Sequence, residues 1–222
     1  AVALFCWMAI PHFKDDVVQK NALFLRKRYW LYYLLTFMAG ARRQIFTVFA
    51  GFLLVEKFGF PLESMVLLVL SNAAINIYVA PKIGKLINFI GERRALTLEY
   101  CGLIGIFLSY AVVDNVVIAI VLYILDHIFF SMAIAIKTYF QKIADPADIS
   151  ATAGISFTIN HIAAVVLPAI LGLVWLVDHR AVFVIGASIA VGSLILSQLI
   201  PTAPTQGNEI RWPVGETQAE NN

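Results

Sequence analysis

The chain has 222 residues, of which 60% are hydrophobic and only 14% are charged, and its formal net charge is +2. Soluble domains are about 45–50% apolar and about 25% charged, so this composition excludes an ordinary water-soluble fold. A net charge this small gives no support for nucleic acid as a partner. Cys6 and Cys101 stand too far apart in sequence to suggest a metal cluster or a disulfide framework.

The first residues, 1–13, begin with an apolar run that is too short to cross a bilayer, which needs about 20 residues. The run also lacks the basic start and the small-residue cleavage site of a secretory signal. We therefore expect residues 1–13 to be the tail of a truncated transmembrane helix and residues 14–28 to be a basic cytoplasmic linker. On this interpretation the chain is a fragment of a longer protein.

Six long apolar segments follow within residues 29–200. Only helices and closed barrels satisfy their backbone groups in lipid, and these runs are continuous and not alternating. The sequence therefore predicts an all-α integral membrane protein with a bundle of six transmembrane helices. The predicted helices cover residues 29–55, 65–80, 95–113, 116–136, 149–177 and 181–200. The tail, residues 201–222, is polar and rich in Pro, Gly, Asn and Gln, and we predict that it is disordered.

The basic residues predict the orientation of this bundle, because cytoplasmic loops carry an excess of Lys and Arg. Lys57 and Arg180 lie on one side, and Arg42 and Arg43 lie inside a span and are not counted. The twelve other basic residues lie on the opposite side: Lys14, Lys20, Arg26, Lys27, Arg28, Lys82, Lys85, Arg93, Arg94, Lys137, Lys142 and Arg211. We expect both termini to be cytoplasmic, in a membrane such as the prokaryotic inner membrane.

The first predicted helix carries Arg42, Arg43 and Gln44 near its centre, where a charge costs about 2.5–3.5 kcal/mol to insert. Arg43 falls on the stripe of Gly40 and Thr47, which favours a cavity-facing position, whereas Arg42 projects about 100° away. A guanidinium suits carboxylate or phosphate groups. The alternative use of these arginines is a salt bridge to Asp126 that only holds the bundle together, and Arg42 is the better candidate for pairing with a neighbouring helix.

Other predicted helices also carry polar groups near mid-membrane. A carboxylate at the level of Asp126 must be paired or protonated, which suits a coupling or gating role. A histidine can relay protons or donate to an anion, and amides can bind a solute or join helices. The candidate solute or coupling residues are Asn72, Asn76, Tyr123, Asp126, His127, Asn160 and His161, together with Arg42, Arg43 and Gln44.

The third and sixth predicted helices are less polar than the other four, so we expect them to face lipid while the others line a polar path. Glu99 lies close to the predicted start of the third helix. Its side chain is expected to reach toward Arg93 and Arg94 at the membrane surface, and it then needs no function.

Motifs of catalysis are absent from the sequence. It contains no Gly-x-Ser-x-Gly elbow, no His-Glu-x-x-His pair and no phosphate-binding Gly-Lys-Ser/Thr loop. We therefore predict that the chain is not an enzyme and uses no cofactor and no metal.

The stretch from Pro81 to Arg94, predicted to be the loop between the second and third helices, resembles a loop motif of the major facilitator superfamily. That motif runs Gly, three residues, Asp-Arg, one residue, Gly-Arg and a basic residue. Gly84, Gly91 and Arg93 match it. Asn88, Phe89 and Glu92 depart from it, and Arg94 follows as a further basic residue.

The resemblance implies that residues 29–200 are the C-terminal half of such a transporter, helices seven to twelve. In that family this loop helps to control the cytoplasmic gate, and the first, second, fourth and fifth helices of each half surround the cavity. The chain would then be a secondary active transporter working by alternating access, driven by protons or ions, for a small solute that the arginines suggest is an anion. Its partners would be the solute, the lipid bilayer and a missing N-terminal half, with no nucleic acid. The alternatives are a non-transporting membrane scaffold or sensor and a half-transporter that works as a homodimer.

Overall fold

A computed structural model describes residues 25–211 of the chain. Within these residues, six helices are long and apolar enough to cross a membrane, so the predicted all-α membrane bundle is confirmed. The predictions for residues 1–24 and 212–222, which include the truncated first helix, most of the basic linker and the end of the tail, lie outside the described residues.

The first spanning segment is assembled from several helical pieces, whereas the later ones are more regular. It consists of η1 (Lys27–Tyr29), α2 (Trp30–Gln44), η2 (Ile45–Ala50), which is a π-helix, and α3 (Gly51–Phe58). The other segments are α4 (Leu62–Ile90), α5 (Glu92–Val112), α6 (Val116–Phe130) with η3 (Ser131–Ala133) and α7 (Ile134–Ile143), η4 (Pro146–Asp148) with α8 (Ile149–Val177), and α9 (His179–Ser197).

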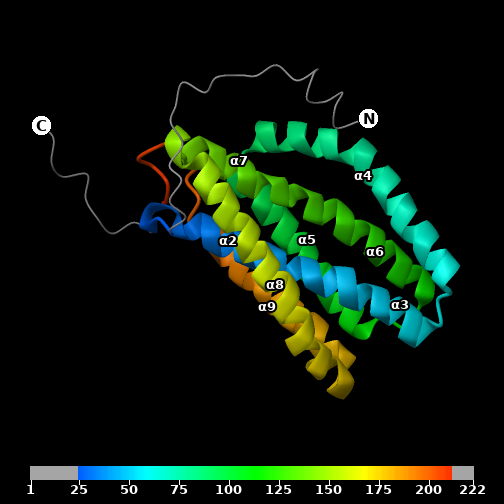
Figure 1. The fold of residues 1–222 in the computed structure, drawn as a ribbon. Coiled ribbons are helices and arrows are strands. Elements are labelled where there is room, and N and C mark those ends of the chain that lie inside the picture. The colour runs from blue at the N-terminus through cyan, green and yellow to red at the C-terminus, as the bar shows by residue number, and fades with distance from the viewer. Residues whose placement is uncertain (1–24, 212–222) are drawn as a thin grey trace, which may run out of the picture.

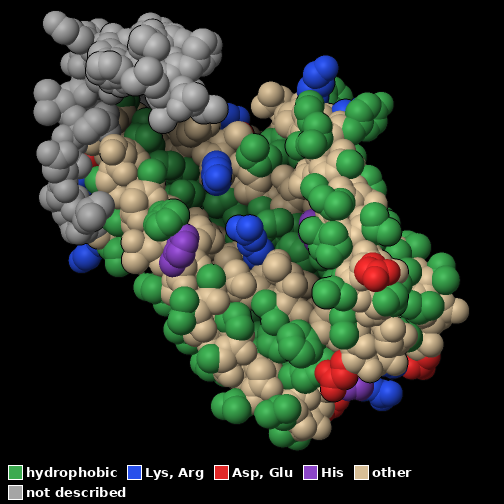
Figure 2. All heavy atoms as spheres, turned by 45° about the vertical axis from the view of Figure 1, so that its right-hand side comes forward, with side chains coloured by type: hydrophobic (Ala, Val, Ile, Leu, Met, Phe, Trp, Pro, Cys, Tyr) green, Lys and Arg blue, Asp and Glu red, His purple; other side chains and the backbone are tan. Residues whose placement is uncertain are grey.

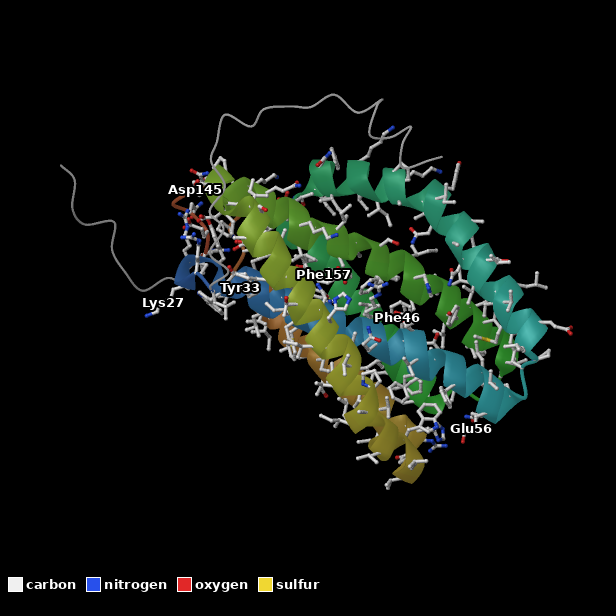
Figure 3. The ribbon with its side chains drawn as sticks, viewed as in Figure 1. Lys27, Tyr33, Phe46, Glu56, Asp145 and Phe157 are labelled. Carbon is white, nitrogen blue, oxygen red and sulfur yellow. The ribbon has the colours of Figure 1, made fainter. Side chains whose placement is uncertain are left out.

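The helices pack as a bundle in which α5 and α9 lie side by side and α2 contacts both α8 and α9. The segment α6–α7 packs against α5, and α4 lies on the flank of the bundle away from α8 (Figure 1). Figure 3 shows Lys27 and Asp145 together at one end of the bundle and Glu56 at the other, with Phe46 and Phe157 between them. We call the first end the basic end, because it holds Arg26, Lys27 and Arg28.

The apolar core is divided into two clusters along the length of the bundle. One includes Tyr29, Leu96 and Tyr139 toward the basic end. The other includes Leu53 and Phe183 toward the opposite end. Burial of such side chains stabilises the fold by about 25 cal/mol per Å² of apolar surface in water, but contacts to lipid offer no such gain, so close packing must supply more of the stability here.

The prediction of a loop at residues 81–94 is wrong. The helix α4 continues through Pro81 to Ile90, and α5 begins at Glu92, so Gly91 alone separates them. Gly91 has a φ of 84°, which a residue with a side chain rarely adopts, and this allows the abrupt reversal. Proline removes one helical hydrogen bond, a loss that membrane helices tolerate. The resemblance of this stretch to the family motif does not depend on its being a loop.

The prediction of a disordered tail is wrong for residues 201–211. This segment is anchored at the basic end, where Gln206 Nε2 donates to the carbonyl of Ala144 at 2.7 Å and Tyr139 Oη donates to the carbonyl of Glu209 at 2.6 Å. Arg28 Nη2 also pairs with Glu209 Oε1 at 2.6 Å. The polar composition that suggested disorder therefore supplies hydrogen bonds to helix ends.

At the opposite end, Lys57 Nζ donates to Asp114 Oδ1 at 2.8 Å and to the carbonyl of Val113 at 2.5 Å. The hydrogen bond from Lys57 lowers the pKa of the exposed Asp114 carboxyl. A lowered pKa in the folded state stabilises the fold above the ordinary pKa of the group, and this contribution is lost as the pH falls through the lowered value. We therefore expect the thermal midpoint of the parent protein to fall slightly when the pH becomes acidic. The same fall should be smaller in Asp114→Asn, which has no carboxylate at this position. An unchanged pH profile in that variant would contradict a role for this contact.

Candidate functional site

One face of the bundle is hollowed, and polar side chains from four spanning segments lie on it. Figure 2 shows this face, with Lys, Arg and His side chains in and around the hollow. We use the name crevice face for the exposed or half-buried polar residues near the middle of these four segments, which are Arg43, Gln44, Asn76, His127, Asn160 and His161.

Arg42 and Arg43 are neighbours in α2 but have opposite surroundings. Arg43 is exposed and makes no hydrogen bond or ion pair with any described residue. Arg42 is fully buried. The π-helical segment η2 begins directly after Gln44. Short π-helical segments inside α-helices are frequent at functional sites. This one begins two residues after Arg43, the residue that the sequence predicts to face the cavity.

A shallow notch lies between α4 and the segment α6–η3, lined by apolar residues and by the polar side chains of Asn72, Asn76, His127 and Ser131. Ser131 Oγ donates to Asn76 Oδ1 at 3.1 Å, and Asn72 Nδ2 donates to the carbonyl of Tyr123 at 3.5 Å. His127 Nδ1 lies 3.1 Å from the same carbonyl. The asparagines therefore hold α4 against α6, while Asn76 and His127 remain partly accessible from the crevice face.

The helix α8 supplies a histidine and an amide to the crevice face. His161 is exposed, with Nδ1 2.9 Å from the carbonyl of Phe157 and its ring 3.9 Å from the Phe157 ring. Asn160 is half-buried, and its Nδ2 donates to the carbonyl of Ser156 at 3.0 Å. A Cβ atom at Gly40 of α2 would lie only 2.8 Å from Asn160 Oδ1, so the glycine allows α2 and α8 to approach closely at this point.

The buried Arg42 has its partners in α5 and α9. Its Nη2 atom lies 3.3 Å from Glu99 Oε1, its Nη1 atom donates to Ser193 Oγ, and its guanidinium lies 4.4 Å from the centre of the Tyr100 ring. The interpretation of Glu99 as a surface residue is wrong. Glu99 is fully buried, because α5 begins at Glu92 and places it two turns inside the helix.

Asp126 is also fully buried and faces the bundle interior, not the crevice. Neither of its oxygen atoms has a hydrogen-bond partner among the described residues. The predicted salt bridge between an arginine and Asp126 is not found, since Arg42 pairs with Glu99. Tyr123, one turn before Asp126, is likewise buried. The structure thus separates the predicted residues into the crevice face and an interior group of Arg42, Tyr123 and Asp126, with Asn72 at their boundary.

The residues of the predicted gate motif lie around the junction of α4 and α5. Asn88 and Arg94 are exposed, whereas Gly84, Gly91 and Arg93 are half-buried. Glu92, which stands where the motif has arginine, pairs through Oε1 with Lys142 Nζ of α7 at 2.5 Å. The sequence analysis missed this link, although an acidic residue directly before two arginines was a signal that Glu92 has an ion-pair partner.

Among residues 25–211, no group of three or more His, Cys, Asp or Glu side chains is arranged to hold a metal ion. The chemistry that the crevice face offers is hydrogen bonding and positive charge. Arg43 supplies a positive charge, and His127 and His161 supply imidazole groups that can donate or accept hydrogen bonds. Such a surface can bind a polar or anionic molecule without forming a covalent bond to it.

Six spanning helices around a hollowed polar face define an integral membrane protein of the transporter class. The family model of the Major Facilitator Superfamily matches residues 7–168, and the chain belongs to this family of membrane transporters. The match includes the stretch from Pro81 to Arg94 and the candidate residues of the first five spanning segments. No curated protein matches the chain.

Proposed function

We propose that this chain is the C-terminal half of a secondary active transporter that carries a small anionic solute by alternating access. In this proposal the solute binds between the crevice face and an N-terminal half of the same protein, and a proton or ion gradient drives transport. The chain is oriented with both termini of the fragment in the cytoplasm, as its basic residues predict, in the inner membrane of a prokaryote.

The observation that carries the proposal is the environment of Arg43. This guanidinium is exposed near the middle of its spanning segment and has no ion-pair partner among the described residues, although such a charge is costly within a membrane. On the same segment and the next, the exposed acidic residues Glu56 and Glu63 lie close to helix ends. The middle of the crevice face is therefore positively charged, which favours an anion.

The roles that we assign follow from the positions of the side chains. Arg43 binds the charged group of the solute, and Gln44, Asn76 and Asn160 offer hydrogen bonds to its polar groups. His127 and His161 offer imidazole nitrogens that can donate or accept further hydrogen bonds. Gly84, Asn88, Gly91, Arg93 and Arg94 act in the cytoplasmic gate, as the family resemblance implies.

The test is Arg43→Gln in the whole transporter, assayed in lipid vesicles with a panel of anionic, neutral and cationic solutes. Losing a hydrogen bond to a charged group costs about 1.5–3 kcal/mol, so transport of an anion should fall by about tenfold to a hundredfold. Arg180→Gln, which removes an exposed arginine at the opposite end of the bundle, is the matched control and should transport normally. Normal anion transport by Arg43→Gln, with the parent active, would contradict the proposal.

A non-transporting scaffold or sensor is the second candidate, and the buried pair of Arg42 and Glu99 favours it, because a permanently paired network would suit a static bundle. The same panel separates the two functions. A scaffold moves no solute at any pH in the parent protein, whereas the proposed carrier moves an anion and responds to an imposed pH gradient.

A further inference from the structure

Beyond α9, residues 201–211 fold back against the basic end of the bundle (Figure 1). The chain reverses there in a tight turn, which the amide of Asn208 closes by donating to the carbonyl of Thr205 at 3.0 Å. Gly207 takes a φ of 88° in this turn, a backbone conformation that favours glycine. The turn directs Glu209 toward the start of the first spanning segment.

Glu209 joins the start of the first spanning segment to the end of the fourth. Its Oε1 atom accepts a hydrogen bond from Arg28 Nη2 at 2.6 Å, and its backbone carbonyl accepts one from Tyr139 Oη at 2.6 Å. Three residues earlier, Gln206 Nε2 donates to the carbonyl of Ala144 at 2.7 Å. The segment therefore bridges η1 and α7, which lie far apart in the sequence.

The same two parts of the bundle are also joined directly, by contacts that do not involve the segment after α9. Arg26 Nη2 pairs with Asp148 Oδ1 at 2.9 Å, and the amide of Asp145 donates to Tyr29 Oη at 3.0 Å. The Asp148 side chain is only 2% exposed, whereas the Arg28 side chain is 41% exposed. The basic end thus has an inner attachment that is largely buried and an outer attachment that is open to water.

We propose that residues 201–211 form a reversible clasp, which docks and undocks as one unit and is held closed by the ion pair of Arg28 and Glu209. Exposed ion pairs contribute little free energy and are weakened by salt, so the closed and open states are close in free energy. When the clasp opens, the inner attachment keeps the bundle folded. Ionic strength then controls how firmly the start of the first spanning segment is held, whatever solute the protein carries.

Undocking as one unit follows from the way in which the segment closes on itself. The amide of Arg211 donates to the carbonyl of Leu199 at 2.7 Å, so the two ends of the segment are joined to each other. The ion pair and the hydrogen bond from Tyr139 involve the side chain and the backbone of the same residue, Glu209. When Arg28 releases the side chain, the bond to the backbone is loosened with it.

Hydrogen exchange of the purified protein in lipid vesicles, followed by mass spectrometry of its peptides, tests the proposal without a known solute. Glu209→Gln should raise amide exchange in residues 201–211 and also in residues 25–33 and 139–148, by about twofold to fivefold, as expected for loss of an exposed ion pair. Arg28→Gln should give the same increase. The double variant should give no more than either single variant, because all three lack the same contact.

Salt and a matched variant provide the controls. In about 1 M salt the screening length falls to about 3 Å, so exchange in the parent should rise to the level of Glu209→Gln. Asp114→Asn removes another exposed ion pair, with Lys57 at the opposite end of the bundle, and should leave exchange at the basic end unchanged.

Several results would overturn the proposal. A rise confined to residues 201–211 would make the segment a passive end of the chain, and unchanged exchange in either single variant would remove the ion pair from its role. A larger rise in the double variant, or a parent that does not respond to salt, would contradict a single ionic contact. A rise throughout the spanning segments, or one that Asp114→Asn reproduces, would show general loosening of the fold instead of a clasp.

Discussion

Arg42→Leu should destabilise the protein by about 3–5 kcal/mol, the usual cost of removing one partner from a buried ion pair. The variant leaves Glu99 fully buried without its cation, and Ser193 and the Tyr100 ring lose their contact with the guanidinium. Chemical unfolding in detergent micelles, followed by circular dichroism at neutral pH, measures the change in the free energy of unfolding.

The next residue provides the matched control for this variant. Arg43→Leu removes the same charge from an exposed position of the same helix and should change the free energy of unfolding by only about 0.5 kcal/mol, as surface substitutions do. A double variant, Arg42→Leu with Glu99→Leu, should recover stability relative to Arg42→Leu, since apolar replacement of a whole buried pair is often neutral. Equal stability of the two single variants would show that the buried pair makes no special contribution.

The number and type of the spanning segments could be predicted from sequence because a helix that crosses the bilayer must be apolar over about 20 consecutive residues. Their ends could not. The predicted second helix, 65–80, stops before Pro81, whereas α4 reaches Ile90 through a polar stretch with two lysines. Outside the hydrocarbon region, polar residues are compatible with both helix and loop, so composition no longer distinguishes the two. The same ambiguity explains why residues 201–211 were predicted to be disordered.

The crevice face could be predicted only in part. The helical period correctly set Arg43 and Arg42 on different sides of α2, because that relation depends on one helix alone. The partner of Arg42 depends on which helices pack together, and Glu99 is far from it in sequence. A shift of the helix start from residue 95 to Glu92 was enough to change Glu99 from a surface residue to an interior one.

Two helices share a pattern in which one of two adjacent charged or titratable residues faces the interior and the next faces the crevice. Arg42 and Arg43 show it in α2, and Asp126 and His127 show it in α6. Any rotation of α2 or α6 that moves the crevice residue must also move the buried one. A movement of either helix therefore changes the surroundings of the exposed and of the buried residue together, through a rigid element and without direct contact.

The packing of α5 against α6 depends on a glycine. A Cβ atom at Gly102 would lie 2.4 Å from Cε1 and 2.6 Å from Cδ1 of the Phe129 ring. Gly102→Val should therefore force α5 and α6 apart or displace the ring, at a cost of about 1–3 kcal/mol, as overpacking in a close-packed interior does. Thermal unfolding of the purified variant in micelles measures this loss.

The control for Gly102→Val is Gly105→Val, one turn further along the same helix. No atom lies within 4 Å of a Cβ built at Gly105, so the added side chain meets no neighbour there. Valine also has a higher helix propensity than glycine, which makes this control neutral or slightly stabilising. Equal thermal midpoints for the two variants would mean that Phe129 yields without cost and that the helix spacing at this level is not fixed by Gly102.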